Sequence, residues 1–194
     1  MGLGDAARAT TLDFHEPQCV ALNDVEGRRM RLVTCGVRVT AAVDENGALW
    51  TWGHGRSFLG HDDLHQPELG GCHDIARPRL VRWPSAMDAN IRVAAVSLGW
   101  SHAAVVDDGG NVYTWGHGGN GRLGHGDEQT RVAPAWVRGV PAGEIAAVAA
   151  GGAFTVARSR SGLALAWGAG HCSGQGVLGS HADALAPQII PRTK

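Results

Sequence analysis

Short apolar runs separated by tight turns recur along most of the chain. In its central part, residues 93–98 are apolar and rich in small and β-branched side chains, and residues 102–106 continue in the same way. Residues 107–111, Asp-Asp-Gly-Gly-Asn, form a hairpin signal with Gly and Asn available for positive φ, and residues 112–115 return as the partner strand. No segment shows an apolar period of 3.6 residues over a dozen positions, so the pattern predicts strands.

The same order of elements is found before and after this central part. The first turn signal is Asp44-Glu45-Asn46-Gly47 with a return strand at 48–52, and the last is 159–162 with a return strand at 163–167. A proline followed by apolar residues then leads a further strand in each unit, at 78–81, 134–137 and 187–190. The chain is therefore expected to be all-β.

Glycine and tryptophan recur at fixed spacing. A Trp-Gly pair occurs three times, a Gly precedes each of these Trp residues by sixteen positions, and a Leu-Gly pair follows in the next loop. Such self-similarity is the signature of a repeat architecture, so we expect these residues to be structural. They are Gly36, Trp52, Gly53, Leu59, Gly60, Gly99, Trp115, Gly116, Leu123, Gly124, Gly151, Trp167, Gly168, Leu178 and Gly179.

The spacing divides the chain into one partial and three complete units. We predict a tail of a preceding repeat at 1–32 and repeats at 33–90, 91–143 and 144–194. The first complete repeat is longer because it carries an extra stretch at about 63–76. The 29 glycines among 194 residues agree with many tight turns, because glycine takes positive φ at no steric cost.

The second repeat carries the most complete form of a longer motif. It reads Val96, Gly99 and His102, then Val112-Tyr113-Thr114-Trp115-Gly116, and ends on Leu123-Gly124-His125-Gly126-Asp127. This pattern resembles the regulator of chromosome condensation repeat family, whose members form seven-bladed β-propellers. The His position holds Val39 in the first repeat and Phe154 in the third, so the copies are divergent.

The resemblance implies a partial, open β-propeller of about three to four blades. An open arc leaves sheet edges uncovered, and stacked repeats need neighbours or caps at their ends. Three alternatives follow: a fragment of a longer protein, an arc completed by another chain or by self-association, and a marginally stable remnant.

Charge and composition narrow the class of function. The formal net charge is −1, which disfavours nucleic acid as a direct ligand. The first eleven residues contain no apolar segment of the kind found in a signal peptide, and no apolar run approaches the roughly 20 residues of a membrane span. With four cysteines at irregular spacing, we expect an intracellular protein, in nucleus or cytoplasm, that has no membrane segment and no zinc site.

No catalytic, metal or cofactor-binding constellation is found. His54, His61, His117 and His125 occupy equivalent positions after Trp-Gly or Leu-Gly pairs, which places them on successive blades and not around one point. The Gly-rich stretch 116–121 lacks the Lys and Ser/Thr of a phosphate-binding loop.

We therefore expect a non-enzymatic scaffold that binds another protein through its loops. The candidate partner contacts are Trp100, His102, Asp62, His65 and Glu68, the last three in the loop at 62–76 that is peculiar to the first repeat. The family resemblance also implies an alternative, a guanine-nucleotide exchange factor for a small Ran-like GTPase or a chromatin-associated regulator. None of the three Trp-Gly loops carries the extension that exchange would need.

Overall fold

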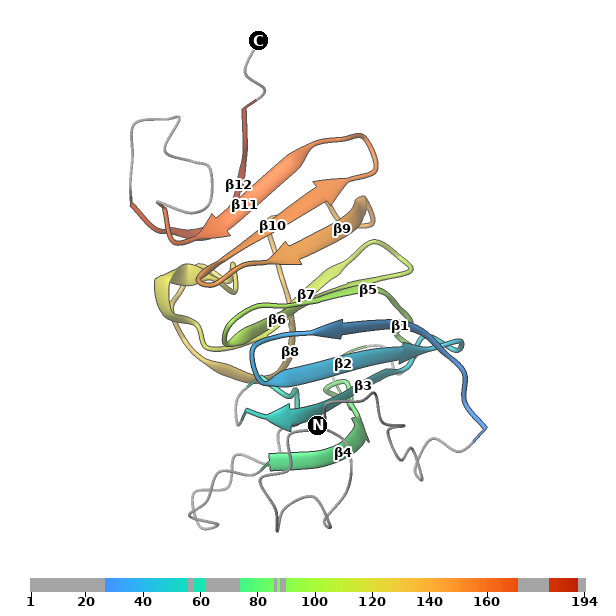
Figure 1. Ribbon diagram of the computed structural model, residues 1–194. Helices are drawn as coiled ribbons and strands as arrows, with labels where there is room; N and C mark the ends of the chain where they lie inside the picture. The colour runs from blue at the N-terminus through green and yellow to red at the C-terminus, as the bar shows by residue number, and fades with distance from the viewer. Residues whose placement is uncertain are drawn as a thin grey trace.

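Three four-stranded antiparallel sheets follow one another along the chain and stack face to face (Figure 1). A computed structural model describes residues 27–55, 58–61, 74–85, 87, 90–170 and 182–191. Within that part of the chain there is no α-helix, and the single helical element is the short 3₁₀ turn η5 (Gly119–Gly121). The prediction of an all-β arc of propeller blades is confirmed.

Each blade is a meander whose strands pair in sequence order, here called the first, second and third blade. The first blade contains β1 (Met30–Cys35), β2 (Val39–Asp44), β3 (Leu49–His54) and β4 (Asp74–Leu80). The second contains β5 (Val93–Leu98), β6 (His102–Asp107), β7 (Val112–Gly116) and β8 (Arg131–Trp136). The third contains β9 (Ile145–Ala150), β10 (Phe154–Ser159), β11 (Ala164–Gly168) and β12 (Ala184–Ile189).

The predicted strands that follow a proline begin earlier than expected. The proline lies inside the outermost strand of each blade, where the pairing with the neighbouring strand shifts register opposite the repeated Trp. A proline cannot donate a hydrogen bond to a ladder and is tolerated at edge strands and bulges. Because Pro78 lies inside β4 and does not start it, β4 already begins at Asp74, within the stretch 63–76 that was predicted to be an insertion.

A glycine closes the hairpin between the second and third strand of every blade. Gly47, Gly110 and Gly162 all have φ +83°, while the asparagines that were also expected to serve there do not adopt positive φ. An acidic residue opens the first turn, since Asp44 Oδ1 accepts hydrogen bonds from the backbone N–H groups of Asn46 and Ala48. The first hairpin is thus closed by its own side chain, while the carbonyls of Gly47 and Gly110 accept hydrogen bonds from the next blade.

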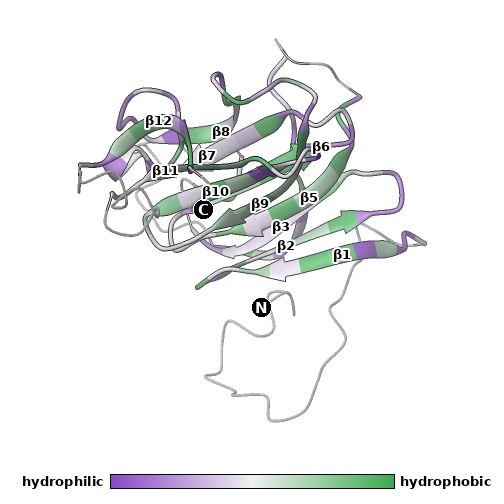
Figure 2. Ribbon diagram, turned by 90° about the horizontal axis from the view of Figure 1, so that it is seen from above, coloured by the Kyte–Doolittle hydropathy of each residue, from purple (hydrophilic) through white to green (hydrophobic). Residues whose placement is uncertain are grey.

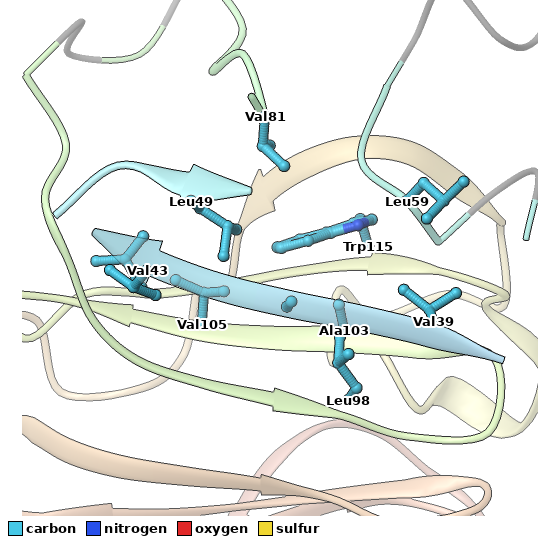
Figure 3. Packing of buried hydrophobic residues seen from close by; sticks show 11 residues of the cluster. Val39, Val43, Leu49, Leu59, Val81, Leu98, Ala103, Val105 and Trp115 are labelled. Carbon is cyan, nitrogen blue, oxygen red and sulfur yellow. The ribbon is translucent and has the colours of Figure 1, made fainter. Parts of the chain in front are cut away.

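The cores lie between blades, because each sheet buries one face against the next. One cluster joins Val39, Val43 and Leu49 of the first blade to Val105 and Trp115 of the second (Figure 3). A second cluster joins β6 and β7 to β10 and β11 in the same manner. Hydrophobic residues run along the strands of all three sheets in Figure 2, as this stacking requires.

The repeated Trp is the largest side chain in both interfaces. Trp115 and Trp167 have no exposed surface. Each indole lies against the glycine of the preceding blade's Leu-Gly pair: a Cβ built on Gly60 would lie 3.0 Å from Trp115 Nε1, and one on Gly124 would lie 2.8 Å from Trp167 Nε1. The glycines are therefore required for the blades to approach, and the two interfaces repeat one contact.

Candidate interaction surface

One tryptophan departs from this buried pattern. Trp100 lies in the turn between β5 and β6 and is 72% exposed, the most exposed large apolar residue in the described part of the chain. Its backbone N–H donates to the carbonyl of Gly151 in the third blade. Gly152 leaves room for the ring, because a Cβ there would lie 3.2 Å from Trp100 Cδ2. The indole thus rests on the neighbouring blade and presents much of its surface to solvent.

A guanidinium group lies beside this indole. Arg122, which directly follows η5, donates from Nη1 to Ser101 Oγ and to the carbonyl of Gly152, and from Nη2 to Asn120 Oδ1. None of the ion pairs among the described residues involves Arg122. Burial lowers the pKa of this guanidinium from its ordinary value, since Arg122 is only 9% exposed. Trp100, Ser101, Arg122 and Gly152 are called the loop surface below.

The loop surface is supported from beneath by a buried hydrogen-bonded link between blades. His102 Nε2 lies 2.8 Å from Thr155 Oγ1, and the hydroxyl of Thr155 donates to the carbonyl of Arg122. Because the one hydroxyl proton goes to that carbonyl, His102 must donate through Nε2. His102 is fully buried under Gly99 and does not reach the surface, so its part is to fix the two blades and not to contact a partner.

The buried histidines make stability depend on pH. Desolvation, with the positive charge of Arg122 or Arg131 nearby, lowers the pKa of His102 and of His125 to about 4. The unfolded chain takes up these protons near pH 6.5 and the folded chain only near pH 4. The free energy of unfolding should therefore fall as pH falls through this window, by about 1.4 kcal/mol per pH unit for each histidine.

The change His102→Val tests this directly, since valine stands at the equivalent position 39. We expect the free energy of unfolding, measured in urea, to differ less between pH 7 and pH 5 in the variant, because unfolding of the variant takes up about one proton fewer. An unchanged difference would mean that His102 is solvated or already charged in the folded protein.

The histidines after the Leu-Gly pairs also have a structural role. His61 Nε2 lies 3.0 Å from Thr51 Oγ1, and His125 Nε2 lies 2.9 Å from Thr114 Oγ1. Each threonine hydroxyl donates in turn to the carbonyl of the leucine two residues before the histidine, Leu59 or Leu123. Threonine and histidine together thus close the loop between the third and fourth strand. Among the described residues no group of three His, Cys, Asp or Glu side chains could hold a metal ion.

Of the predicted partner contacts, the structure places one at an accessible position. Trp100 is exposed and His102 is buried, and the two lie in the same turn. Asp62, His65 and Glu68 lie outside the described residues, as do Leu178 and Gly179 of the repeated set. Arg122 could not be predicted as part of this surface, because a single arginine after a Gly-rich turn has no distinguishing pattern. Its place directly before the repeated Leu123 brings Arg122 over the next blade.

No helix in the described part of the chain is long and apolar enough to cross a membrane. Two models of the regulator of chromosome condensation (RCC1) repeat match the chain, at residues 109–158 and at residues 93–122. Both matches fall on the second blade and the start of the third.

Relatives among known proteins extend the likeness beyond these residues. The ultraviolet-B receptor UVR8 of Arabidopsis thaliana is 32% identical over 188 residues, which cover 96% of this chain and 38% of the receptor. The mitochondrial RCC1 domain-containing protein RUG3 of the same plant is 29% identical over 70% of this chain and 28% of its own length. The chain thus spans well under half of the relatives it matches.

Solved structures share the fold. Prp20p of Saccharomyces cerevisiae superposes with a TM-score of 0.71 at 20% identity, over 84% of this chain and 39% of that protein. At this identity the likeness establishes the architecture of stacked blades alone.

Proposed function

Because this chain is built from repeats of the regulator of chromosome condensation family, we propose that it is a non-enzymatic scaffold whose loop surface binds another protein. The observation that carries the proposal is the exposed indole of Trp100 seated on a rigid inter-blade junction. Tryptophan is enriched at binding hot spots because it offers a large contact area at a low cost in side-chain entropy.

The surroundings of Trp100 define the contact further. Arg122 is 9% exposed, and its guanidinium donates to oxygen atoms of Gly119, Asn120, Ser101 and Gly152, so it holds in place the loops around Trp100. A partner that places an apolar side chain on the exposed indole would complement the loop surface. The equivalent turns of the first and third blades carry Val37, which is 64% exposed, and Gly152, on which the indole rests.

Affinity capture with the 194-residue chain and with Trp100→Ala tests the proposal. We expect the variant to lose at least five-fold in recovery of specific partners, because truncating a hot-spot tryptophan costs about 2 kcal/mol or more. Val33→Ala is the control, since Val33 is 67% exposed on β1 of the first blade. Equal recovery by all three proteins would exclude the loop surface as the binding site.

A second candidate function concerns a small GTPase. The solved structure of Prp20p was described together with its binding properties to Gsp1p and histones, and the present chain shares its blade architecture. Guanine-nucleotide exchange or chromatin association is therefore the alternative. Release of a fluorescent nucleotide from Gsp1p, a Ran-like GTPase, measured with and without the chain, separates exchange from simple scaffolding.

A further inference from the structure

An apolar groove lies between the second and third blades, away from the loop surface. It measures about 540 Å³, within the range of pockets that hold drug-sized ligands. Its walls are formed by the segment after β8 and by the third blade's outer strands, with apolar side chains from Val140, Pro141, Leu163, Leu165, Pro187 and Ile189. Ile189 is 57% exposed at its edge. This site is called the rim groove below.

The preceding interface shows what fills such a site. There Trp83, in the segment after β4, packs edge-on against Tyr113 of the next blade, with ring centroids 5.1 Å apart. Tyr113 pairs with Trp136 across the sheet just as Leu165 pairs with Ile189, so Tyr113 and Leu165 hold equivalent positions. Trp83 therefore covers Tyr113 in the first interface, and the equivalent Leu165 in the second interface forms a wall of the rim groove.

A change of residue type leaves the rim groove empty. The backbone N–H groups of Val81 and Val137 both donate to the carbonyl of the first residue of the third strand in their own blade, which places the two segments in the same register. Trp83 follows Val81 by two positions, and Gly139 follows Val137 by two. A Cβ built on Gly139 would have Pro187 Cδ as its nearest neighbour, at 3.8 Å, so a side chain from this position would enter the groove. Glycine supplies none.

A positively charged residue directly precedes Gly139 of the rim groove in the chain. Arg138 precedes Gly139 and holds its guanidinium 6.0 Å from the centroid of the exposed Trp136 ring. None of the ion pairs within the described ranges includes Arg138. An acidic residue next to the occupant would complement it.

We propose that the rim groove receives an aromatic side chain, flanked by an acidic residue, from a partner polypeptide. The inference rests on the proposed function as a scaffold and adds to it a second contact with stated chemistry. The partner's ring takes the position that Trp83 takes in the first interface, and its carboxylate lies toward Arg138.

The test uses the acetylated, amidated peptide Gly-Asp-Trp-Pro-Gly carrying 5-fluorotryptophan, with binding to the full chain followed by ¹⁹F NMR. We expect saturable broadening of the fluorine signal and at least five-fold weaker binding by Ile189→Glu. The control is Leu80→Glu, because Leu80 is 40% exposed and holds the equivalent strand position in the first blade, away from the rim groove. That control should bind within two-fold of the unaltered chain.

Two further arms separate the possible failures. Trp100→Ala should leave peptide binding unchanged, and a peptide with Asn in place of Asp should bind more weakly. Loss of binding in Trp100→Ala with none in Ile189→Glu would place the peptide on the loop surface and overturn the rim groove. No saturable binding to the unaltered chain would overturn it as well, whereas partner capture through Trp100 tests the proposed function separately.

Discussion

Replacing Trp115 by alanine should destabilise the protein by about 3–5 kcal/mol, the usual cost of truncating a buried aromatic side chain to alanine. The indole is fully buried between the first and second blades and contributes to the largest cluster of core residues. It also donates from Nε1 to the carbonyl of Phe58, at 3.1 Å, so the change leaves a partly buried carbonyl without this donor. Urea unfolding followed by circular dichroism measures the loss.

Trp136→Ala is the matched control for this change, because Trp136 lies on the adjacent strand of the same blade and is partly exposed. We expect it to cost less than about 1 kcal/mol. Similar losses for the two variants would show that Trp115 does not fill an inter-blade site.

The second large effect is expected at Gly124, whose replacement by alanine should push the second and third blades apart. The new Cβ would lie 2.8 Å from Trp167 Nε1, and the backbone has φ +77°, which an L-residue adopts at a cost of about 1–2 kcal/mol. Overpacking against the buried indole adds about 1–3 kcal/mol.

Gly126 separates the two contributions, because it has φ +88° and no atom within 4 Å of a Cβ built on it. Gly126→Ala should therefore show the backbone cost alone. The difference in unfolding free energy between the two variants reports the contact between Gly124 and Trp167. Equal losses would mean that the indole does not rest on this glycine.

The strands were predictable from sequence because local signals agree with the fold. Residues 93–98 form β5 with the expected bounds, and the turn at 107–111 closes as expected around Gly110. The outer strands were less predictable. Their prolines, such as Pro134, mark a register shift in the middle of the strand and not its start, and this depends on the neighbouring strand.

The interaction surfaces depend on contacts that sequence does not display. Trp100 stood out because no equivalent tryptophan occurs in the other repeats, but its exposure follows from Gly152 on the next blade. His102 looked like a surface residue and is buried, because Gly99 covers its ring and Thr155 of the third blade pairs with it. The rim groove appears only when the blades are compared in space.

Exchange of the indole N–H protons tests the central claim, that blades stack through a repeated tryptophan set against a glycine of the blade before. In ¹⁵N-tryptophan-labelled protein transferred to D₂O, the indole signals of Trp115 and Trp167 should persist long after those of Trp100 and Trp136 have disappeared, because only the first two are fully buried. Loss of all four signals at the same early time would contradict the stacking described above.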